Sequence, residues 1–251
     1  MEGSELNMFS LYEISFSKVI LYVLAAVLPA AVLMFYIYRN DKVEKEPRQL
    51  LGRLLLGGVF AALASMALEY AADYGIVMYA ENTDMTMSAY GVISAASVGI
   101  IEELTKFFFL HRFSWNHPAF NYRFDGIVYA VFVSLGFAAF ENILYILFYG
   151  GIELAVPRAL LAIPAHMSFA VYMGLMYGLA KIYDSKGDTM KSNIYLTLGF
   201  VLAAVLHAVY DGSIMVGTEA SVMFFYGFVV VMDILVFLTI RMSSKTDRRI
   251  Y

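Results

Sequence analysis

Seven apolar runs, each long enough to cross a lipid bilayer as a helix, dominate this sequence. They cover residues 18–38, 50–72, 89–111, 125–149, 157–181, 192–216 and 220–241. A bilayer core needs about 20 apolar residues, and lipid offers the backbone no hydrogen-bond partners, so such runs form helices. Hydrophobic residues make up 61% of the 251-residue chain and charged residues 15%, against about 45–50% and about 25% in soluble domains. The sequence therefore predicts an all-α, polytopic membrane bundle of about seven transmembrane helices.

The loops between these runs are too short to fold alone, so we expect a single integral membrane domain over residues 1–251. Its parts would be an extracytoplasmic leader at 1–17, a transmembrane bundle at 18–241 and a cytoplasmic tail at 242–251. The first run is too long for a cleaved signal, and its leader carries Glu2, Glu5 and Glu13 rather than basic residues. We interpret it as a retained span.

Cysteine is absent, which excludes disulfides, thiolate metal ligands and a cysteine nucleophile. The net charge of −4 gives no reason to expect a nucleic-acid partner. Residues 40–48 mix both charge signs around one proline, a pattern typical of a solvated interfacial turn.

Lysine and arginine gather in alternate loops. They follow the first, third, fifth and seventh runs, whereas residues 73–88 and 213–221 contain none. Basic loops of membrane proteins stay in the cytoplasm. This bias predicts an amino terminus outside and a carboxyl terminus in the cytoplasm.

Two adjacent glutamates, Glu102 and Glu103, lie within the third run, and Lys106 follows closely. A carboxylate at membrane depth costs about 2.5–3.5 kcal/mol on insertion scales. Lys106 is four residues from Glu102 and three from Glu103, and both separations allow contact on a helix. Spacing slightly favours the pair with Glu102. The other glutamate, turned about 100° around the helix, would then face a different wall of the cavity. The pattern indicates a chemical site inside the bilayer.

Other ionisable residues inside the runs fall at a similar depth. At 1.5 Å per residue, Glu141, His166 and His207 lie about 13–15 Å from the outer face, and Glu102 about 20 Å. Asp211 is four residues beyond His207 and shares its helix face. We expect these side chains to meet in one polar pocket near the midplane.

Several other polar or small residues have simpler interpretations. Glu69 and Asp233 lie near a run end or lack an evident partner, which favours an interfacial or snorkelling acid. Gly174 and Gly178 form a Gly-x-x-x-Gly pattern, which favours close helix packing. Asn142, next to Glu141, is expected to support the site.

Two histidines and a carboxylate, with a second carboxylate nearby, match the donor set of a hydrolytic zinc site. His166, His207 and Glu141 would hold the metal, with Asp211 as a further candidate ligand. Glu102 or Glu103 would be the base that activates water. Without metal, a glutamate could activate water with help from the histidines. A proton-coupled transporter is a rival, because buried Glu, His and Lys also mark ion paths, and a non-catalytic immunity or scaffold protein is a third.

Five segments resemble, in order, the motifs of PrsW-type intramembrane proteases. They are Asp41–Pro47, Ile101–Lys106, Phe137–Asn142, Pro164–His166 and His207–Asp211. That family is grouped with CAAX-processing and bacteriocin-processing proteases. The resemblance implies hydrolysis of a peptide bond in a membrane-bound protein by an enzyme of a prokaryotic cell membrane. It also implies a single-span anti-sigma factor as substrate, first cut on its extracytoplasmic side.

The resemblance also implies roles for the two glutamates. The wider group resembles Glu-Glu-x-x-x-Arg, in which the first glutamate is catalytic and the second pairs with the arginine. In this chain the basic residue is Lys106, one position earlier, so family logic points to Glu102 as the base while helical spacing points to Glu103. The wider group has histidine where this chain has Glu141, a change that favours a His/His/Glu zinc site.

Overall fold

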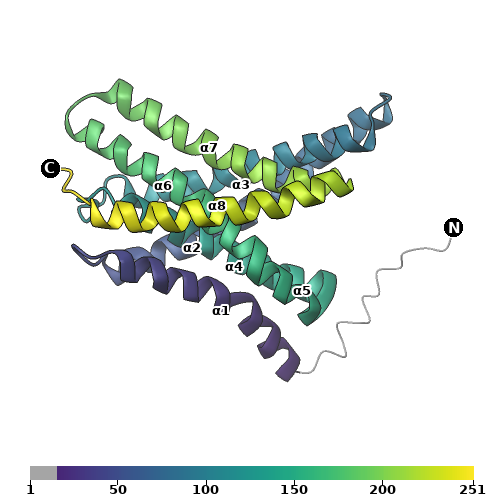
Figure 1. Cartoon of the computed structure of the whole chain (residues 1–251), viewed down its shortest axis with the longest axis horizontal. Helices are drawn as coiled ribbons and strands as arrows, with labels where there is room; N and C mark the ends of the chain where they lie inside the picture. The colour runs from purple at the N-terminus through teal and green to yellow at the C-terminus, as the bar shows by residue number, and fades with distance from the viewer. Residues whose placement is uncertain (1–15) are drawn as a thin grey trace.

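Most helices of this chain begin and end close to the limits of its apolar runs, but the second continues to Glu81, nine residues beyond the expected end at 72. The structure, a computed structural model, describes residues 16–251, and residues 1–15 of the expected leader lie outside the described part. Seven long helices form the bundle of Figure 1: α1 (Phe16–Asn40), α2 (Arg48–Glu81), α3 (Met87–Ser114), α4 (Asp125–Tyr145), α6 (Ile163–Ser185), α7 (Thr189–Met215) and α8 (Glu219–Lys245). The all-α expectation is confirmed.

Local sequence signals fix several of these ends. Thr86, Asp188 and Thr218 are N-caps whose side-chain oxygens accept a hydrogen bond from a backbone N–H in the first turn of α3, α7 and α8. Gly187 and Gly217 follow α6 and α7 with φ of 77° and 70°. Only glycine adopts that left-handed conformation without steric cost. The connections are therefore tight turns.

Six of the seven long helices are long and apolar enough to cross a membrane, so the chain is a multi-pass membrane protein. The candidate spans are Lys18–Asn40, Arg48–Glu81, Asp125–Phe148, Glu153–Ser185, Thr189–Met215 and Glu219–Lys245. Helix α3 is the exception, because its apolar stretch carries Glu102, Glu103 and Lys106.

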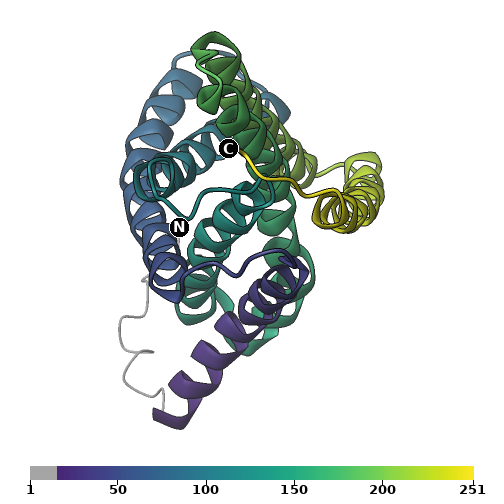
Figure 2. The same cartoon turned by 90° about the vertical axis from the view of Figure 1, so that its left-hand side faces the viewer.

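Helix α4 lies at the centre of the bundle. It packs against α1, α2, α3 and α6, and it is apolar on nearly every face, as a helix buried on all sides must be. Helix α7 packs against α3 and α6, and α8 lies at the edge, against α6 and α7 (Figure 2). This arrangement brings the middle turns of α3, α4, α6 and α7 together.

Close contact between α4 and α6 depends on glycine. A Cβ on Gly126 would lie 2.6 Å from the carbonyl oxygen of Gly174 and 2.7 Å from the amide nitrogen of Gly178. No larger residue fits there. The Gly-x-x-x-Gly pattern of Gly174 and Gly178 is therefore a helix-packing feature, as expected.

The connection after α4 differs from the expected loop. The chain stays helical through a π-helical turn (Ile146–Gly150), the short helix α5 (Gly151–Pro157) and a second π-helical turn (Arg158–Ala162) that leads into α6. π-helical turns often occur at functional sites. The second turn directs Arg158 into the bundle, which the apolar pattern did not indicate.

The segment after α1 is exposed at residues 42–45, as expected of a solvated turn, but two of its acids are buried. Asp41 is 1% exposed and Glu46 is 3% exposed. The Tyr129 hydroxyl donates a hydrogen bond to Glu46, and Asn121 donates one to Glu44. These contacts tie the segment to α4 and to the α3–α4 connection, and they place Asp41 and Glu46 in the folded core.

Candidate intramembrane active site

Helix α3 places a compact ion cluster in the bundle interior. Nζ of Lys106 lies 2.9 Å from Oε2 of Glu102 and 2.8 Å from Oε1 of Glu103. The three side chains are almost entirely buried, and the ammonium also lies 4.0 Å from the centre of the Phe137 ring. The expectation that Lys106 pairs with only one glutamate was wrong. Residues three and four positions away are both within reach of a lysine side chain.

Helix α6 adds His166, whose two ring nitrogens face groups of opposite charge. Its Nδ1 lies 3.1 Å from Nζ of Lys106, and its Nε2 lies 3.1 Å from Oε2 of Glu141 on α4. An ammonium can only donate, so Nδ1 accepts and Nε2 carries the proton directed at Glu141. Nη2 of Arg158 lies 3.0 Å from the same Glu141 oxygen.

Helix α7 adds His207, which lies between carboxylates. Its Nδ1 lies 3.0 Å from Oε1 of Glu103 and 3.9 Å from Oε2 of Glu102. Its Nε2 lies 3.3 Å from Oδ2 of Asp211, one turn further along α7. Phe169 stacks on the ring at a centroid distance of 4.8 Å. The imidazole is held in one orientation.

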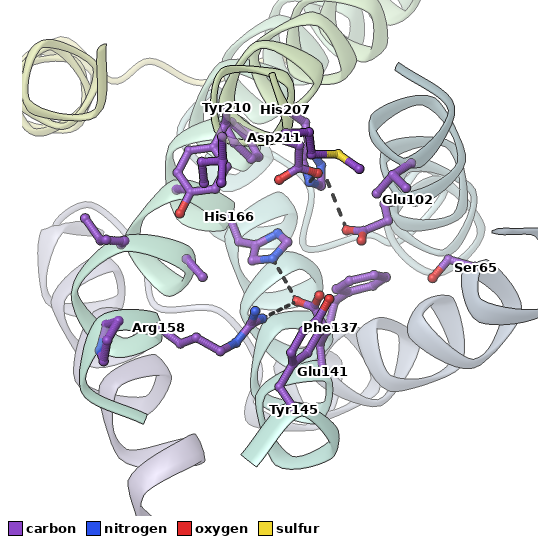
Figure 3. A pocket seen from close by; sticks show the side chains of 18 of the residues that line it. Ser65, Glu102, Phe137, Glu141, Tyr145, Arg158, His166, His207, Tyr210 and Asp211 are labelled. Atoms are coloured by element: carbon purple, nitrogen blue, oxygen red, sulfur yellow. Dashed lines mark hydrogen bonds and ion pairs between the residues drawn. The ribbon is translucent and has the colours of Figure 1, made fainter. Parts of the chain in front are cut away.

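These side chains border a cavity of about 830 Å³ between α2, α3, α4, α6, α7 and α8. Figure 3 shows the polar side chains directed toward this common space. The lining includes Glu102, Glu141, His166, His207, Asp211 and Arg158. The expected meeting of the acids and imidazoles in one pocket is therefore present. Glu103 and Lys106 lie behind the wall, and Oε2 of Glu103 is buried without a hydrogen-bond partner.

Two lining residues were misjudged or missed in the sequence. Glu69 was interpreted as an interfacial acid, yet it lines the cavity together with Glu102. One signal in the sequence could have identified Arg158: it is a lone arginine that follows Pro157 at the start of an apolar run.

Asp233, which had no evident partner in the sequence, accepts a 3.0 Å hydrogen bond from the Ser168 hydroxyl. Asn142, expected to support the site, accepts a hydrogen bond from Arg158.

The donor set matches that of a metal site. Ligand atoms of Glu102, Glu103, His166 and His207 lie within 4.8 Å of one another, and all four residues are buried. The Lys106 ammonium contacts three of these four, so a cation already stands among them.

A second group of donors lies on the cavity side. The His166 and His207 rings are 5.4 Å apart between centroids, and their Nε2 atoms face Glu141 and Asp211. His207 is arranged as a ligand should be, because Nδ1–H can donate to Glu103 while Nε2 stays available.

The chain matches a known family over most of its length. Residues 45–239 match the model of the family described as PrsW family intramembrane metalloprotease. The chain belongs to the PrsW family of intramembrane metalloproteases. The matched range contains every residue of the site described above, and a PrsW-family chain is a peptidase. Transport and a non-catalytic scaffold role are therefore set aside.

Curated relatives agree with this membership. The Protease PrsW of Geobacillus kaustophilus is 38% identical over 187 residues, which cover 74% of this chain and 76% of the relative. The Protease PrsW of Bacillus subtilis is 34% identical over 187 residues, 74% of this chain and 79% of the relative. The Protease PrsW of Clostridioides difficile is 29% identical over 212 residues, which cover 83% of this chain and 85% of the relative. No solved structure matches this PrsW-family chain.

Proposed function

We propose that this PrsW-family peptidase cuts a peptide bond inside or beside the bilayer with Glu102 as the general base. The observation that carries this proposal is the orientation of the two glutamates. Glu102 lines the cavity, whereas Glu103 lies behind its wall and contacts Lys106 and His207. A base must reach the water that it deprotonates. Glu103 then acts as the residue that positions His207.

The same proposal assigns a zinc ion to the cavity side, held by His166, His207 and Glu141, with Asp211 as a further ligand. Two imidazoles and a carboxylate are the donors that hydrolytic zinc sites use. When bound, zinc supplies Lewis-acid polarisation of a carbonyl and lowers the pKa of a water molecule to near 7. This set is chosen because its donors face the cavity and the Lys106 ammonium stands on the opposite side.

The protein side chains perform the proton transfers and fix the geometry. Glu102 accepts a proton from the attacking water and delivers it to the departing amine. Lys106 holds the Glu102 carboxylate in place from behind. Arg158, the cationic guanidinium in the cavity wall, lies where it can stabilise negative charge that develops on the carbonyl oxygen. A helical peptide bond is shielded, so the substrate segment must unwind to enter.

The proposed substrate is a single-span membrane protein, an anti-sigma factor by family resemblance, cut on its extracytoplasmic side. We place the amino terminus outside and the carboxyl terminus in the cytoplasm, with α3 as a seventh span. The α1–α2 and α6–α7 connections lie at the same end as the carboxyl terminus (Figure 1), and these connections carry the basic residues. Residues 1–17 would then be an outside leader, and 18–241 and 242–251 the bundle and cytoplasmic tail of one domain.

Single Glu→Gln variants test the assignment of the base. Glu102→Gln should lower the cleavage rate of a single-span reporter by about 10²–10⁴-fold, the usual contribution of a general base. Glu153→Gln, a matched change at an exposed position on α5, should cleave at the parental rate. Rates are compared at equal amounts of folded protein in the membrane. Parental cleavage by folded Glu102→Gln would overturn the proposal.

A further inference from the structure

The catalytic cavity has a side branch that the proposed chemistry does not use. A second cavity of about 370 Å³ lies between α2 and α3, toward the α2–α3 connection. Four residues line both spaces: Met66, Glu69, Val98 and Met215. A group that lies in the branch can therefore belong to a peptide that crosses the main cavity.

The charged residues that line the branch are all acidic. Glu69 and Asp73 line it, together with Tyr90 and two serines, and no lining residue is basic. Asp73 accepts a 3.1 Å hydrogen bond from the Tyr90 hydroxyl. The branch therefore presents acceptors and negative charge.

Glu69 differs from the other carboxylates in the cavity wall. Glu102 pairs with Lys106, Glu141 with Arg158, and Asp211 with His207. Among the described residues 16–251, Glu69 forms no ion pair with a lysine, arginine or histidine, and its Oε1 is buried without a hydrogen-bond partner. A buried acceptor left unpaired is costly, so an incoming donor gains from binding it.

Ser94 gives a second and independent indication of a ligand. This residue is 7% exposed and lines the branch, and its hydroxyl also lacks a hydrogen-bond partner. Met66, Ile76, Val98 and Met215 supply the apolar part of the lining. The branch thus combines an apolar wall with two oxygen atoms that lack a hydrogen-bond partner, Oε1 of Glu69 and the Ser94 hydroxyl oxygen.

We propose that this branch is a substrate subsite that takes a lysine or arginine side chain located close to the cleaved bond, with Glu69 as its carboxylate. Lysine and arginine carry a cationic head on an apolar stem, which matches the lining. The ammonium or guanidinium donates to Glu69 and Ser94, and the methylene groups contact the methionines. The assignment rests on the proposed protease function.

The subsite has a consequence for substrate choice. With the orientation proposed above, the branch opens toward the extracytoplasmic side, where basic residues beside spans are scarce. A pocket that requires one there would reject most other single-span proteins. Glu69 would therefore determine specificity without taking part in the chemical step.

Paired reporters test the subsite. Residues on each side of the cleaved bond of a single-span reporter are replaced, one at a time, by lysine or by methionine, which is similar in length but uncharged. We expect one position at which lysine raises kcat/KM at least about tenfold over methionine. Glu69→Gln should remove that ratio, and Ser94→Ala should reduce it. Glu81→Gln, an exposed change on the same helix, should retain it. Cleavage without lysine preference, or preference unchanged in Glu69→Gln, overturns the subsite.

A binding measurement separates this inference from the protease function. Purified protein in detergent is titrated with n-butylguanidinium and with uncharged n-butylurea, and thermal stability is followed, because ligands that bind the folded state raise it. The wild type should be stabilised only by the cation, with an apparent affinity at least about tenfold weaker in Glu69→Gln. Equal effects of the two probes, or equal affinity in the variant, overturn the subsite even if no reporter is cleaved. Binding without any cleavage would instead count against the protease proposal alone.

Discussion

Oε1 of Glu103 lies 3.0 Å from Nδ1 of His207 and so connects α3 to α7 at the wall of the catalytic cavity. The contact holds a proton on Nδ1, because a carboxylate can only accept. Nε2 of His207 is then left toward the cavity and Asp211. The sequence left Glu103 as an alternative candidate for the base. In our proposal Glu103 instead positions His207.

Removal of the buried ammonium should destabilise the protein strongly. Lys106→Met leaves Glu102 and Glu103 side by side without a counter-charge. Breaking a buried ion pair typically costs about 3–5 kcal/mol. We expect a loss of that size in the free energy of unfolding, measured by denaturant titration in detergent.

Two further variants make this test specific. The triple variant Glu102→Gln, Glu103→Gln, Lys106→Met should recover most of the loss, since no charge is left unpaired. Lys191→Met removes a pair with Asp188 that is exposed to solvent and should change stability little. Wild-type stability of Lys106→Met would contradict the structural importance of the cluster.

Metal content should depend on the cavity-side donors. Elemental analysis of the purified protein should find about one zinc ion per chain, lost in both Glu141→Ala and His166→Ala. His117→Ala, in the α3–α4 connection, should retain zinc, because its Nδ1 only accepts a hydrogen bond from the Ala119 amide. A chelator should lower the thermal stability of the wild type but not of the two depleted variants. A parent protein without zinc would point to the glutamate-only scheme.

Helix α2 should tolerate a methyl group at one glycine and not at another. A Cβ on Gly58 would lie 2.0 Å from the carbonyl oxygen of Val133 on α4, whereas nothing lies within 4 Å of one on Gly52. Gly58→Ala should therefore cost roughly 1–3 kcal/mol or more through overpacking, and Gly52→Ala should not. Thermal unfolding of the two variants side by side checks this. Equal stabilities would mean that α2 and α4 are further apart than described.

Stability should fall as pH rises, because of the buried acids after α1. Burial raises the pKa of Glu46 from 4.5 to about 7. The hydrogen bond from Tyr129 lowers this pKa in part, and the nearby charge of Asp41 raises it further. Burial likewise raises the pKa of Asp41 to about 6. The folded state then binds more protons than the unfolded state above pH 4.5, so stability is highest at low pH and is lost as pH rises toward 7.

Replacement of Glu46 by glutamine tests whether Glu46 makes stability fall as pH rises. Between pH 5 and 8 the wild type should lose on the order of 2 kcal/mol through Glu46, and Glu46→Gln should show a correspondingly flatter profile and greater stability at pH 8. Unfolding free energies measured across that range decide the matter. A wild-type profile that rises with pH would show that Glu46 is ionised in the folded protein. Glu81→Gln, a change at an exposed position near the end of α2, is the control.

Hydrophobicity along the chain is enough to assign the class of this protein and the approximate positions of its helices. Apolar length is a local property, and a bilayer forces such segments into helices whatever their neighbours. The motif residues from Glu102 to Asp211 were identifiable for a similar reason. Ionisable side chains are rare at membrane depth, so each one stands out against its apolar run.

How these residues face one another depends on the way the helices pack. Successive residues on a helix point about 100° apart, so the rotation of α3 against its neighbours places Glu102 in the cavity wall and Glu103 behind it. The π-helical turn that brings in Arg158, and the branch beside Glu69, depend on how α2, α4 and α6 pack. Such contacts join segments far apart in the chain, and no local pattern of hydrophobicity records them.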